Sequence, residues 1–442
     1  MASEWRNWAG DQGCGPGTIE HPGSRGELID AVGRAAAAGH RLRAAASGHS
    51  FSDIACTNGT MLRLEQLGRM LDLDRASGLV RVEAGITIRR LAEALDTYGL
   101  AMENQGDIDR QTLAGAISTA THGTGAAFRN LSAQLESVEL VLADGSVAEL
   151  GPEDPDALLA ARVGLGTLGI VYAVTLRTVP AFTIRRVDRP APLAETLDGI
   201  DELAAAHDHF EFYAFPHTEI AVLRESERVD GPPRPRPRAA EFLQEVVLEN
   251  WVADAFARAS RALPALTPPL ARFVAGRIRR SVKVDRSYRV FASERRVRFT
   301  EMEYAIPRER AAEAVRQVFE LIEREGLRVS FPIEVRFVAS DDALLSPSHE
   351  RATCYIAVHM YRGVEWEQYF RGVEAIMDSY GGRPHWGKRH FQTAETLAAR
   401  YPRWDEFHRV RERLDPEGRF ANDYTDRVLG PIAQRNVLPS PR

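Results

Sequence analysis

The stretch SGHSFSDIACTNG, residues 47–59, comes directly after a predicted strand. Its small residues Ser47, Gly48 and Ser50 present backbone N–H groups that could cradle a diphosphate. The imidazole of His49 adds a nucleophile to the same turn. A lone histidine in a turn is ordinary, so this stretch alone leaves a structural turn and a cofactor site both open.

A second stretch, LAGAISTATHGTG at 113–125, is unusually rich in small residues. Because small residues let the backbone approach a neighbour closely, we expect a close contact there. The elements predicted around these stretches are a helix at 26–40, a strand at 41–46, strands within 61–82, a helix at 88–98, a hairpin at 138–150 with Asp144-Gly145 at its turn, a helix at 156–162 and a strand at 170–179.

The hexapeptide GLGTLG at 164–169 fits the G-x-G-x-x-G pattern of dinucleotide-binding folds. That fold needs a strand before the glycines and a helix after them, so that the diphosphate meets the helix N-terminus. Here the predicted helix comes first and the predicted strand follows. We therefore reject a Rossmann fingerprint at this position.

The composition and the pattern of predicted elements change near residue 180. Residues 232–238 are rich in proline and predict a solvated loop, and residues 241–280 predict helices interrupted by prolines. The segments predicted beyond them are strands at 288–304, 330–338 and 355–361 and, over 410–430, a helix, a turn and a closing segment. The middle of the chain is therefore predicted to be a second, inserted domain.

Length and composition agree with two domains. A chain of 442 residues exceeds one ordinary hydrophobic core, and 44% apolar with 27% charged residues is typical of a globular protein. The net charge of −6 gives no whole-chain reason to expect a nucleic acid or an anionic membrane as a partner. Three distant cysteines disfavour a disulfide framework and a zinc site, and no leader or membrane span is visible. We expect a cytoplasmic α+β protein without a metal.

Three motifs together resemble one enzyme family: SGHSFSDIACTNG at 47–59, LAGAISTATHGTG at 113–125 and HWGK at 385–388. In this order they are similar to the sugar-1,4-lactone oxidoreductases of the vanillyl-alcohol oxidase flavoprotein superfamily, which have alditol oxidases as close relatives. The resemblance implies an FAD-binding domain of the PCMH type over 1–180, completed by 410–442. It also implies a substrate-cap domain over 181–409, with an antiparallel sheet flanked by helices.

The resemblance further implies that FAD is bonded covalently to His49 through its C8α methyl group. The residues that would line the FAD are Ser47, Gly48, Ser50, Gly106, Ser118, His122, Gly123, Gly125, Gly169 and Ile170. Of these, His122 is an ordinary turn residue on its own signal, and we assign it no catalytic role.

Glu334-Val335-Arg336 is the first candidate for the chemistry. At i and i+2 of a predicted strand, Glu334 and Arg336 point to the same face. From the residues alone, a salt pair on a solvated sheet is the better interpretation. The resemblance favours function instead, because the family uses such a pair: Glu334 would hydrogen-bond substrate hydroxyls, and Arg336 would stabilise negative charge on the reduced flavin.

Lys388 and His359 are candidates for the base. Lys388 could lose its proton in a desolvated site, or it could stay charged and polarise the substrate oxygen. His359 lies in an apolar strand and fits a core histidine or a group beside the substrate, where relatives place a histidine. His390 extends the motif to HWGKRH, which resembles lactone oxidases more than alditol oxidases, and we place it in the substrate site.

Asp107 and Gly106 bear on substrate and acceptor. Alditol oxidases that resemble this chain have a serine at the position of Asp107, so an open-chain polyol is disfavoured and Asp107 is assigned to substrate binding. Gly106 stands where a small residue admits oxygen to the flavin and where a larger one, as in galactonolactone dehydrogenase, excludes it. Glycine favours an oxidase.

We therefore expect oxidation of an aldonolactone at C2, with hydride transfer to flavin N5 and with oxygen as the acceptor, giving hydrogen peroxide. The alternatives are a dehydrogenase with a cytochrome or quinone acceptor, an alditol or carbohydrate oxidase, and a flavin-binding protein without turnover. His207-Asp208-His209 is interpreted as a solvated helix end rather than a metal site, and 277–298 as cap surface rather than an RNA site. The oligomeric state is left open.

Overall fold

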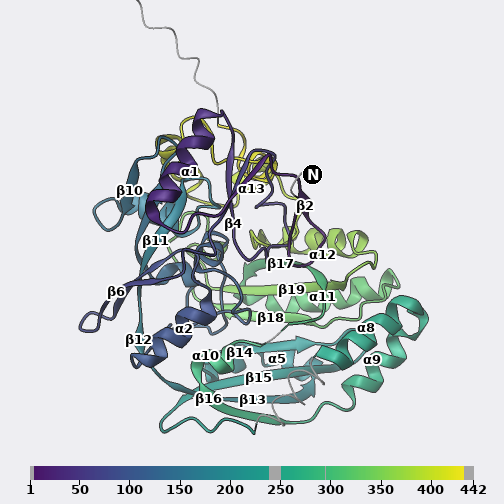
Figure 1. Ribbon diagram of the computed structural model, residues 1–442. Coiled ribbons are helices and arrows are strands. Elements are labelled where there is room, and N and C mark those ends of the chain that lie inside the picture. Colours follow the sequence, from purple (N-terminus) through teal and green to yellow (C-terminus); the bar gives the residue numbers. More distant parts are fainter. Residues whose placement is uncertain (1–3, 238–249, 294, 433–442) are drawn as a thin grey trace, which may run out of the picture.

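The computed structural model describes residues 4–237, 250–293 and 295–432. Within these ranges the strands form a three-stranded, a five-stranded and an eight-stranded sheet and two short pairs. Figure 1 shows the purple and blue N-terminal part together with the yellow C-terminal helices, next to the teal and green eight-stranded sheet. This architecture confirms the predicted α+β class.

The N-terminal part builds two sheets around the first two motifs. The parallel sheet has the order β3 (Thr18–Glu20), β5 (Thr60–Arg63), β4 (Leu42–Ala45). The antiparallel sheet has the order β10 (Val147–Leu150), β9 (Leu135–Val141), β11 (Ile170–Arg177), β7 (Leu79–Glu83), β6 (Met70–Asp74). The short pairs are β1 (Trp5–Arg6) with β2 (Gly13–Cys14) and β8 (Leu100–Ala101) with β12 (Val179–Pro180). The helices are α1 (Arg25–Ala37), α2 (Ile88–Thr97), α3 (Leu113–Ser118) and α4 (Pro155–Arg162).

Local signals predict these elements well. The helices predicted at 26–40, 88–98 and 156–162 are confirmed by α1, α2 and α4. β9 and β10 form the predicted hairpin, whose turn places Gly145 at a φ of +80°. α4 precedes and β11 follows the glycine-rich hexapeptide at 164–169, so this hexapeptide is not a Rossmann fingerprint.

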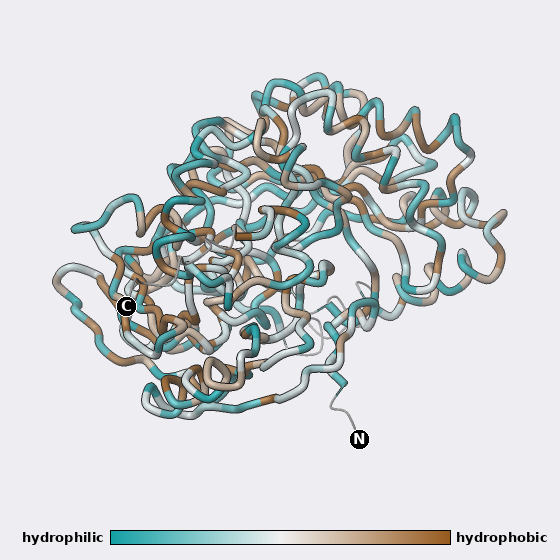
Figure 2. The backbone as a smooth tube through the Cα atoms, turned by 90° about the horizontal axis from the view of Figure 1, so that it is seen from above, coloured by the Kyte–Doolittle hydropathy of each residue, from teal (hydrophilic) through white to brown (hydrophobic). Residues whose placement is uncertain are grey.

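The eight-stranded sheet draws its strands from the middle of the chain, and every neighbouring pair is antiparallel. Its order is β16 (Ser281–Arg286), β13 (Thr183–Pro192), β15 (Ile220–Val229), β14 (His209–Ala214), β18 (Ile333–Val338), β19 (Thr353–Tyr361), β17 (Phe299–Pro307), β20 (Arg383–Pro384). The helices that share its apolar core are α5 (Leu193–Asp198), α6 (Ile200–Ala206), α11 (Ala311–Arg324) and α12 (Glu367–Ser379). Figure 2 shows teal and brown alternating along the outer helical turns, as amphipathic helices require.

One predicted segment of this region differs from the structure, and another agrees with it. The strand predicted at 288–304 is wrong in its first half, because Ser287–Phe291 forms helix α10, in which Ser287 and Val290, three residues apart, are both buried. Two proline-flanked helices, α8 (Ala253–Ala262) and α9 (Thr267–Ala275), occupy the end of the predicted helical region. The part of that prediction that falls on 241–249 lies outside the described residues.

Side chains alternate between the two faces of the eight-stranded sheet. The apolar set that packs under the helices includes Phe210, Phe212, Met302, Tyr304, Val335, Phe337, Ile356 and Val358. The alternate positions of the same strands carry Glu211, Glu301, Glu303, Glu334, Arg336 and His359, all buried. The sheet therefore gathers titratable side chains on the face that points away from its helices.

The C-terminal helices return to the N-terminal part. α13 (Ala394–Ala398), α14 (Trp404–Leu414) and α15 (Asp423–Leu429) place Leu397, Phe407 and Tyr424 in the same apolar core as the side chains of α2 and α4. The Asn422 amide donates hydrogen bonds to the carbonyls of Asp53, Ile54 and Cys56 at 3.2, 3.0 and 2.8 Å. The end of the chain therefore holds the segment that follows His49.

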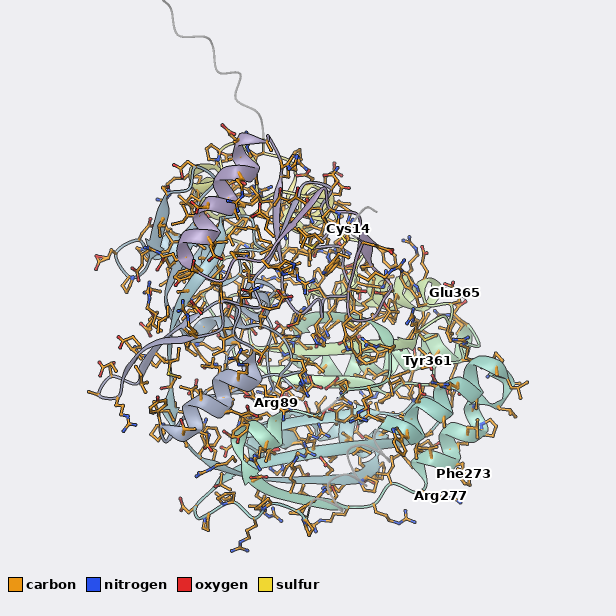
Figure 3. The ribbon with its side chains drawn as sticks, viewed as in Figure 1. Cys14, Arg89, Phe273, Arg277, Tyr361 and Glu365 are labelled. Carbon is orange, nitrogen blue, oxygen red and sulfur yellow. The ribbon has the colours of Figure 1, made fainter. Side chains whose placement is uncertain are left out.

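The basic stretch at 277–298 is only in part the surface that the sequence predicts. The Arg277 guanidinium lies 3.3 Å from the ring centroid of Phe273 at the outer edge of the molecule (Figure 3). Arg295, in contrast, is partly buried and pairs with Asp107 at 2.9 Å. Across the described residues, no helix combines the length and the apolar character needed to span a membrane.

Candidate active site

A cavity opens between the turn at 46–50, helix α3 and the loop at 164–171. Its empty volume is about 1000 Å³, which includes space that is open to solvent. The predicted cofactor residues that line it are Ser47, Gly48, His49, Ser50, Ser118, Gly169 and Ile170. Stretches that lie far apart in the sequence therefore meet at one cavity.

The turn that carries His49 is held by the N-terminal residues. Gly48 has a φ of +67°, and a Cβ there would lie 3.2 Å from the Trp5 ring, so glycine is required. The Trp8 amide donates a hydrogen bond to the Gly48 carbonyl at 2.7 Å. The Trp8 ring stacks on the His49 imidazole with a centroid distance of 5.4 Å. The imidazole is therefore fixed at the cavity wall.

His49 is electrostatically suited to be a nucleophile. Burial lowers the pKa of His49 to about 4, and the positive charges of Lys388, Arg298 and Arg110 act in the same direction. The imidazole is therefore neutral at physiological pH and keeps a lone pair. A bond from this ring to a carbon of the cofactor requires such a lone pair.

Arg43 ties the cavity walls together. Its buried guanidinium donates hydrogen bonds to the carbonyls of Ile54, Leu165, Gly166 and Phe420 at 2.5 to 3.0 Å. Burial lowers the pKa of Arg43 to about 10, which still leaves it charged. One side chain thus joins the His49 segment, the 164–171 loop and the C-terminal segment.

The HWGK segment lies directly against the His49 segment. The Phe51 amide donates to the Gly387 carbonyl at 2.7 Å, and the Ser52 hydroxyl donates to the Trp386 carbonyl at 3.2 Å. Lys388 consequently lines the same cavity as His49. The structure therefore unites the two motifs that the sequence places at opposite ends of the chain.

Lys388 forms an ion pair with a residue of the eight-stranded sheet. Its Nζ lies 2.5 Å from Glu301 Oε2, and Glu301 Oε1 lies 3.5 Å from His359 Nε2. Burial acts to lower the pKa of Lys388, but the carboxylates of Glu301 and Glu303 outweigh it and raise that pKa. Of the two roles open for Lys388, the geometry favours the charged one.

Arg336 is the centre of a second buried cluster. Its Nε donates to Glu211 at 2.9 Å, and its Nη2 pairs both with Asp107, at 3.2 Å, and with Glu334. Burial opposes the charge of Arg336, but these three carboxylates raise its pKa well above the ordinary value. Burial also acts on Asp107, whose pKa is nevertheless lowered by Arg336 and Arg295. The predicted residues Glu334, Arg336 and Asp107 are thus in contact with one another.

A third cluster contains His122, Glu303 and His385, whose potential ligand atoms lie within 4.8 Å of one another. His122 Nε2 lies 3.3 Å from Glu303, and the His122 ring stacks on Tyr355. His385 Nδ1 accepts a hydrogen bond from the Gly387 amide at 3.0 Å, so the neutral ring carries its proton on Nε2. A metal needs a free lone pair from each imidazole, so the cluster is a hydrogen-bonded group beside the cavity rather than a metal centre.

Three predicted cofactor glycines approach protein backbone. A Cβ on Gly106 would lie 3.0 Å from the His122 carbonyl, and one on Gly123 would lie 2.5 Å from the Gln105 carbonyl. Gly125 has a φ of +126°, and its amide donates to the Phe337 carbonyl of β18 at 2.8 Å. At Gly125 the close contact expected for this stretch is therefore made with β18 of the eight-stranded sheet. Contact of these glycines with FAD stays a prediction.

Two predictions on histidines need comment. His390 does not line the cavity; its Nε2 lies 2.9 Å from the Tyr424 hydroxyl, and burial lowers its pKa to about 3. The interpretation of 207–209 as a solvated helix end is wrong for His209, which begins β14, is buried and bonds the Thr124 carbonyl through Nδ1 at 2.8 Å. A role of His390 in substrate binding stays a prediction.

The residues of these clusters that the sequence did not point to are Arg43, Glu211, Arg295, Glu301 and Glu303. Glu301 and Glu303 occur in FTEMEYAIP, where polar residues at alternate positions are typical of a strand with one solvated face. The only sequence signal was their repetition inside an apolar strand. Their partners become visible only through the pairing of β17 with β19.

The fold is that of the FAD-binding oxidases. The structure resembles a solved solvent-stable cholesterol oxidase with a TM-score of 0.81 and 19% identity over 96% of both chains. It also resembles cholesterol oxidase from B. sterolicum, with a TM-score of 0.77 and 16% identity over 96% of both chains. An FAD binding domain profile matches residues 16–151. The class is therefore a flavoprotein with the PCMH-type FAD-binding fold, as the sequence predicts.

The profile of D-arabinono-1,4-lactone oxidase matches residues 174–428. The chain is 51% identical to L-gulono-1,4-lactone dehydrogenase of Mycobacterium tuberculosis over 98% of this chain and 100% of the relative. It is 34% identical to L-gulonolactone oxidase of Mus musculus (96% and 98%) and 30% identical to alditol oxidase of Streptomyces sp. (97% and 100%). The chain belongs to the D-arabinono-1,4-lactone oxidase family of FAD-dependent enzymes, which act on CH–OH groups.

Proposed function

We propose that this protein oxidises an aldonolactone of the gulono-, galactono- or arabinono-1,4-lactone type at C2, with FAD bonded to His49. The observation that carries the proposal is that His49 and Lys388 line one cavity, with Glu301 and His359 directly behind Lys388. In this proposal residues 1–180 and 410–442 bind FAD and residues 181–409 bind the substrate. A cytoplasmic location stays a prediction.

The residues of the cavity fit FAD. Glycine at position 48 lets the cofactor approach the backbone closely, and the neutral His49 imidazole can form the covalent bond to it. The cavity wall extends from the His49 turn to the loop at 164–171. When bound, FAD supplies the ring that accepts the hydride at N5. Every other requirement falls to protein side chains.

The side chains divide the remaining work. Lys388, held as a cation, polarises the substrate oxygen and contributes positive charge at the cavity wall. Glu334 and Asp107 bind substrate hydroxyls, and Arg336 holds both carboxylates in place. The predicted contact of Arg336 with the reduced flavin is a weaker part of the proposal, because Arg336 does not line the cavity and three carboxylates already surround it.

The electron acceptor in this proposal is oxygen, which gives hydrogen peroxide. Glycine at position 106 supports oxygen as the acceptor. A side chain there would press on the His122 carbonyl and narrow the space beside position 106. A lactone dehydrogenase is the second candidate, since the relative with 51% identity is named a dehydrogenase whereas the mouse relative is named an oxidase. An alditol oxidase is third, given the Streptomyces relative.

A substrate panel tests the proposal. The holoenzyme is mixed anaerobically with gulono-, galactono- and arabinono-1,4-lactones and with xylitol, and the flavin absorbance is followed. We expect the lactones to bleach the flavin and xylitol to leave it oxidised. Readmitted oxygen should then restore the colour with formation of peroxide. Bleaching by xylitol alone, or by no sugar, contradicts the proposed substrate; reoxidation only by an added cytochrome or quinone contradicts the proposed acceptor.

A further inference from the structure

Glu301 stands between two candidate bases. Glu301 on β17 is paired directly with His359 on β19. The two oxygens of the Glu301 carboxylate face different partners. Oε2 lies 2.5 Å from Lys388 Nζ, and Oε1 lies 3.5 Å from His359 Nε2. The side chain of Glu301 is only 8% exposed, so the contacts of its carboxylate are made with protein groups. One buried carboxylate thus bridges Lys388 and His359.

The bridge keeps a proton on Lys388. Burial acts to lower the pKa of Lys388, but Glu301 and Glu303, and more weakly Asp107, raise it above the ordinary value. The other titratable groups that interact with Lys388 are His49 and His385, and burial is the main factor that lowers the pKa of each. An ammonium group has no lone pair and cannot accept a proton from a substrate hydroxyl.

The bridge also selects the tautomer of His359. The Glu301 carboxylate can only accept, so the imidazole nitrogen that faces it, Nε2, carries the hydrogen. Nδ1 of His359 then keeps its lone pair. This nitrogen is buried and has no hydrogen-bond partner in the described structure, while Phe299 and Phe331 flank the ring. This nitrogen therefore remains free to accept a hydrogen bond from a donor outside the chain.

We propose that Glu301 is a positioning residue which holds Lys388 as a cation and fixes His359 with a free Nδ1, so that His359 Nδ1 is the base. The inference rests on the proposed lactone oxidation. The substrate O–H bond would break, its proton would go to Nδ1, and its electron pair would form the carbonyl; FAD, when bound, would accept the hydride from the carbon. The imidazolium that results is stabilised by the Glu301 carboxylate, and Lys388 polarises the same oxygen.

Glu301→Gln in the holoenzyme tests this inference. The amide keeps the shape but can donate to Nε2, which favours the opposite tautomer. We expect the rate of anaerobic flavin reduction to fall about 100-fold or more, with a much smaller change in KM. The alkaline limit of the reduction rate should also move to lower pH, because the pKa of Lys388 loses the carboxylate that raises it.

Glu374→Gln is the matched control. Glu374 is also a buried carboxylate beside the eight-stranded sheet, bonded to the Tyr304 hydroxyl and, at 2.8 Å, to the Phe391 amide, but it has no contact with Lys388 or His359. We expect its reduction rate and pH profile to match the wild type. Equal losses in both variants would reduce Glu301 to a structural role and overturn the inference.

The tautomer provides a readout that needs no turnover. Nitrogen-15 NMR of histidine-labelled holoenzyme, with the signal assigned by its loss in His359→Gln, should show the hydrogen of His359 on Nε2 and move it towards Nδ1 in Glu301→Gln. A wild-type hydrogen on Nδ1 overturns the inference, whatever the substrate proves to be. Failure of every lactone to bleach the flavin would instead defeat the proposed function, and the two failures are therefore distinguishable.

Discussion

Replacing Lys388 with methionine is expected to lower kcat/KM for an aldonolactone by about 10²- to 10⁴-fold. Methionine keeps much of the volume of the side chain but removes a cation that lines the cavity beside the His49 turn and pairs with Glu301. The developing charge on the substrate oxygen and on the reduced ring then loses its partner. Stopped-flow measurement of anaerobic flavin reduction reports this step directly.

The other lysine of the chain provides a control. Lys283 lies on β16, the edge strand at the far end of the eight-stranded sheet from β17. Lys283→Met should therefore leave flavin reduction unchanged, and flavin content should be compared in both variants. A Lys388→Met enzyme that keeps a rate within about tenfold of the wild type would show that the ammonium is not part of the chemistry.

Arg336→Met should be the most destabilising single change at the site. It leaves Glu211, Glu334 and Asp107 buried without the guanidinium that all three share. Removal of one partner from a buried ion pair costs about 3–5 kcal/mol, so we expect a loss of that size in the free energy of unfolding at neutral pH. Lactone oxidation should fall with it, because Glu334 and Asp107 lose their orientation.

The pH dependence gives this loss a signature. Burial raises the pKa of Asp107 and of Glu211, but Arg336 and its neighbours outweigh burial and lower both. A lowered folded-state pKa contributes stability above the unfolded value, and that contribution is lost as the pH falls. The deficit of Arg336→Met should therefore shrink as the pH falls below about 4, the ordinary pKa of a carboxyl group. Urea unfolding at neutral and acidic pH measures it.

Arg316→Met is the surface comparison for this prediction. Arg316 pairs with Asp198, and both side chains are about half exposed or more. Its removal should cost less than about 1 kcal/mol at any pH. Equal losses for the two variants, or a loss at position 336 that does not vary with pH, would contradict the assignment of Arg336 as the shared partner of buried carboxylates.

The cofactor motifs could be predicted from the sequence because together they resemble those of one family, whereas the residues of the His49 turn alone leave a structural turn open. His49 with its small neighbours and HWGK are identifiable before any fold is known, and both line the cavity. The spacing of Glu334 and Arg336 likewise predicts a shared face, which the contact between the two side chains confirms. Helix and hairpin boundaries in the N-terminal part follow from caps, glycines and periodicity.

Partners across the sheet could not be predicted in the same way. The position of Glu301 opposite His359 depends on the register of β17 against β19, which the residues of either strand alone do not specify. The small residues Gly123 and Gly125 did signal a close approach, but their neighbours are the Gln105 carbonyl and β18. The sequence identifies where the backbone must approach another group closely, and only the fold identifies that group.

The bond between His49 and FAD is the central claim, and acid denaturation of the purified holoenzyme tests it most directly. The account predicts that the yellow colour stays with the precipitated polypeptide, and that peptide mass analysis finds the flavin on His49. Release of all the colour into the supernatant, or a flavin attached to another residue, would contradict it.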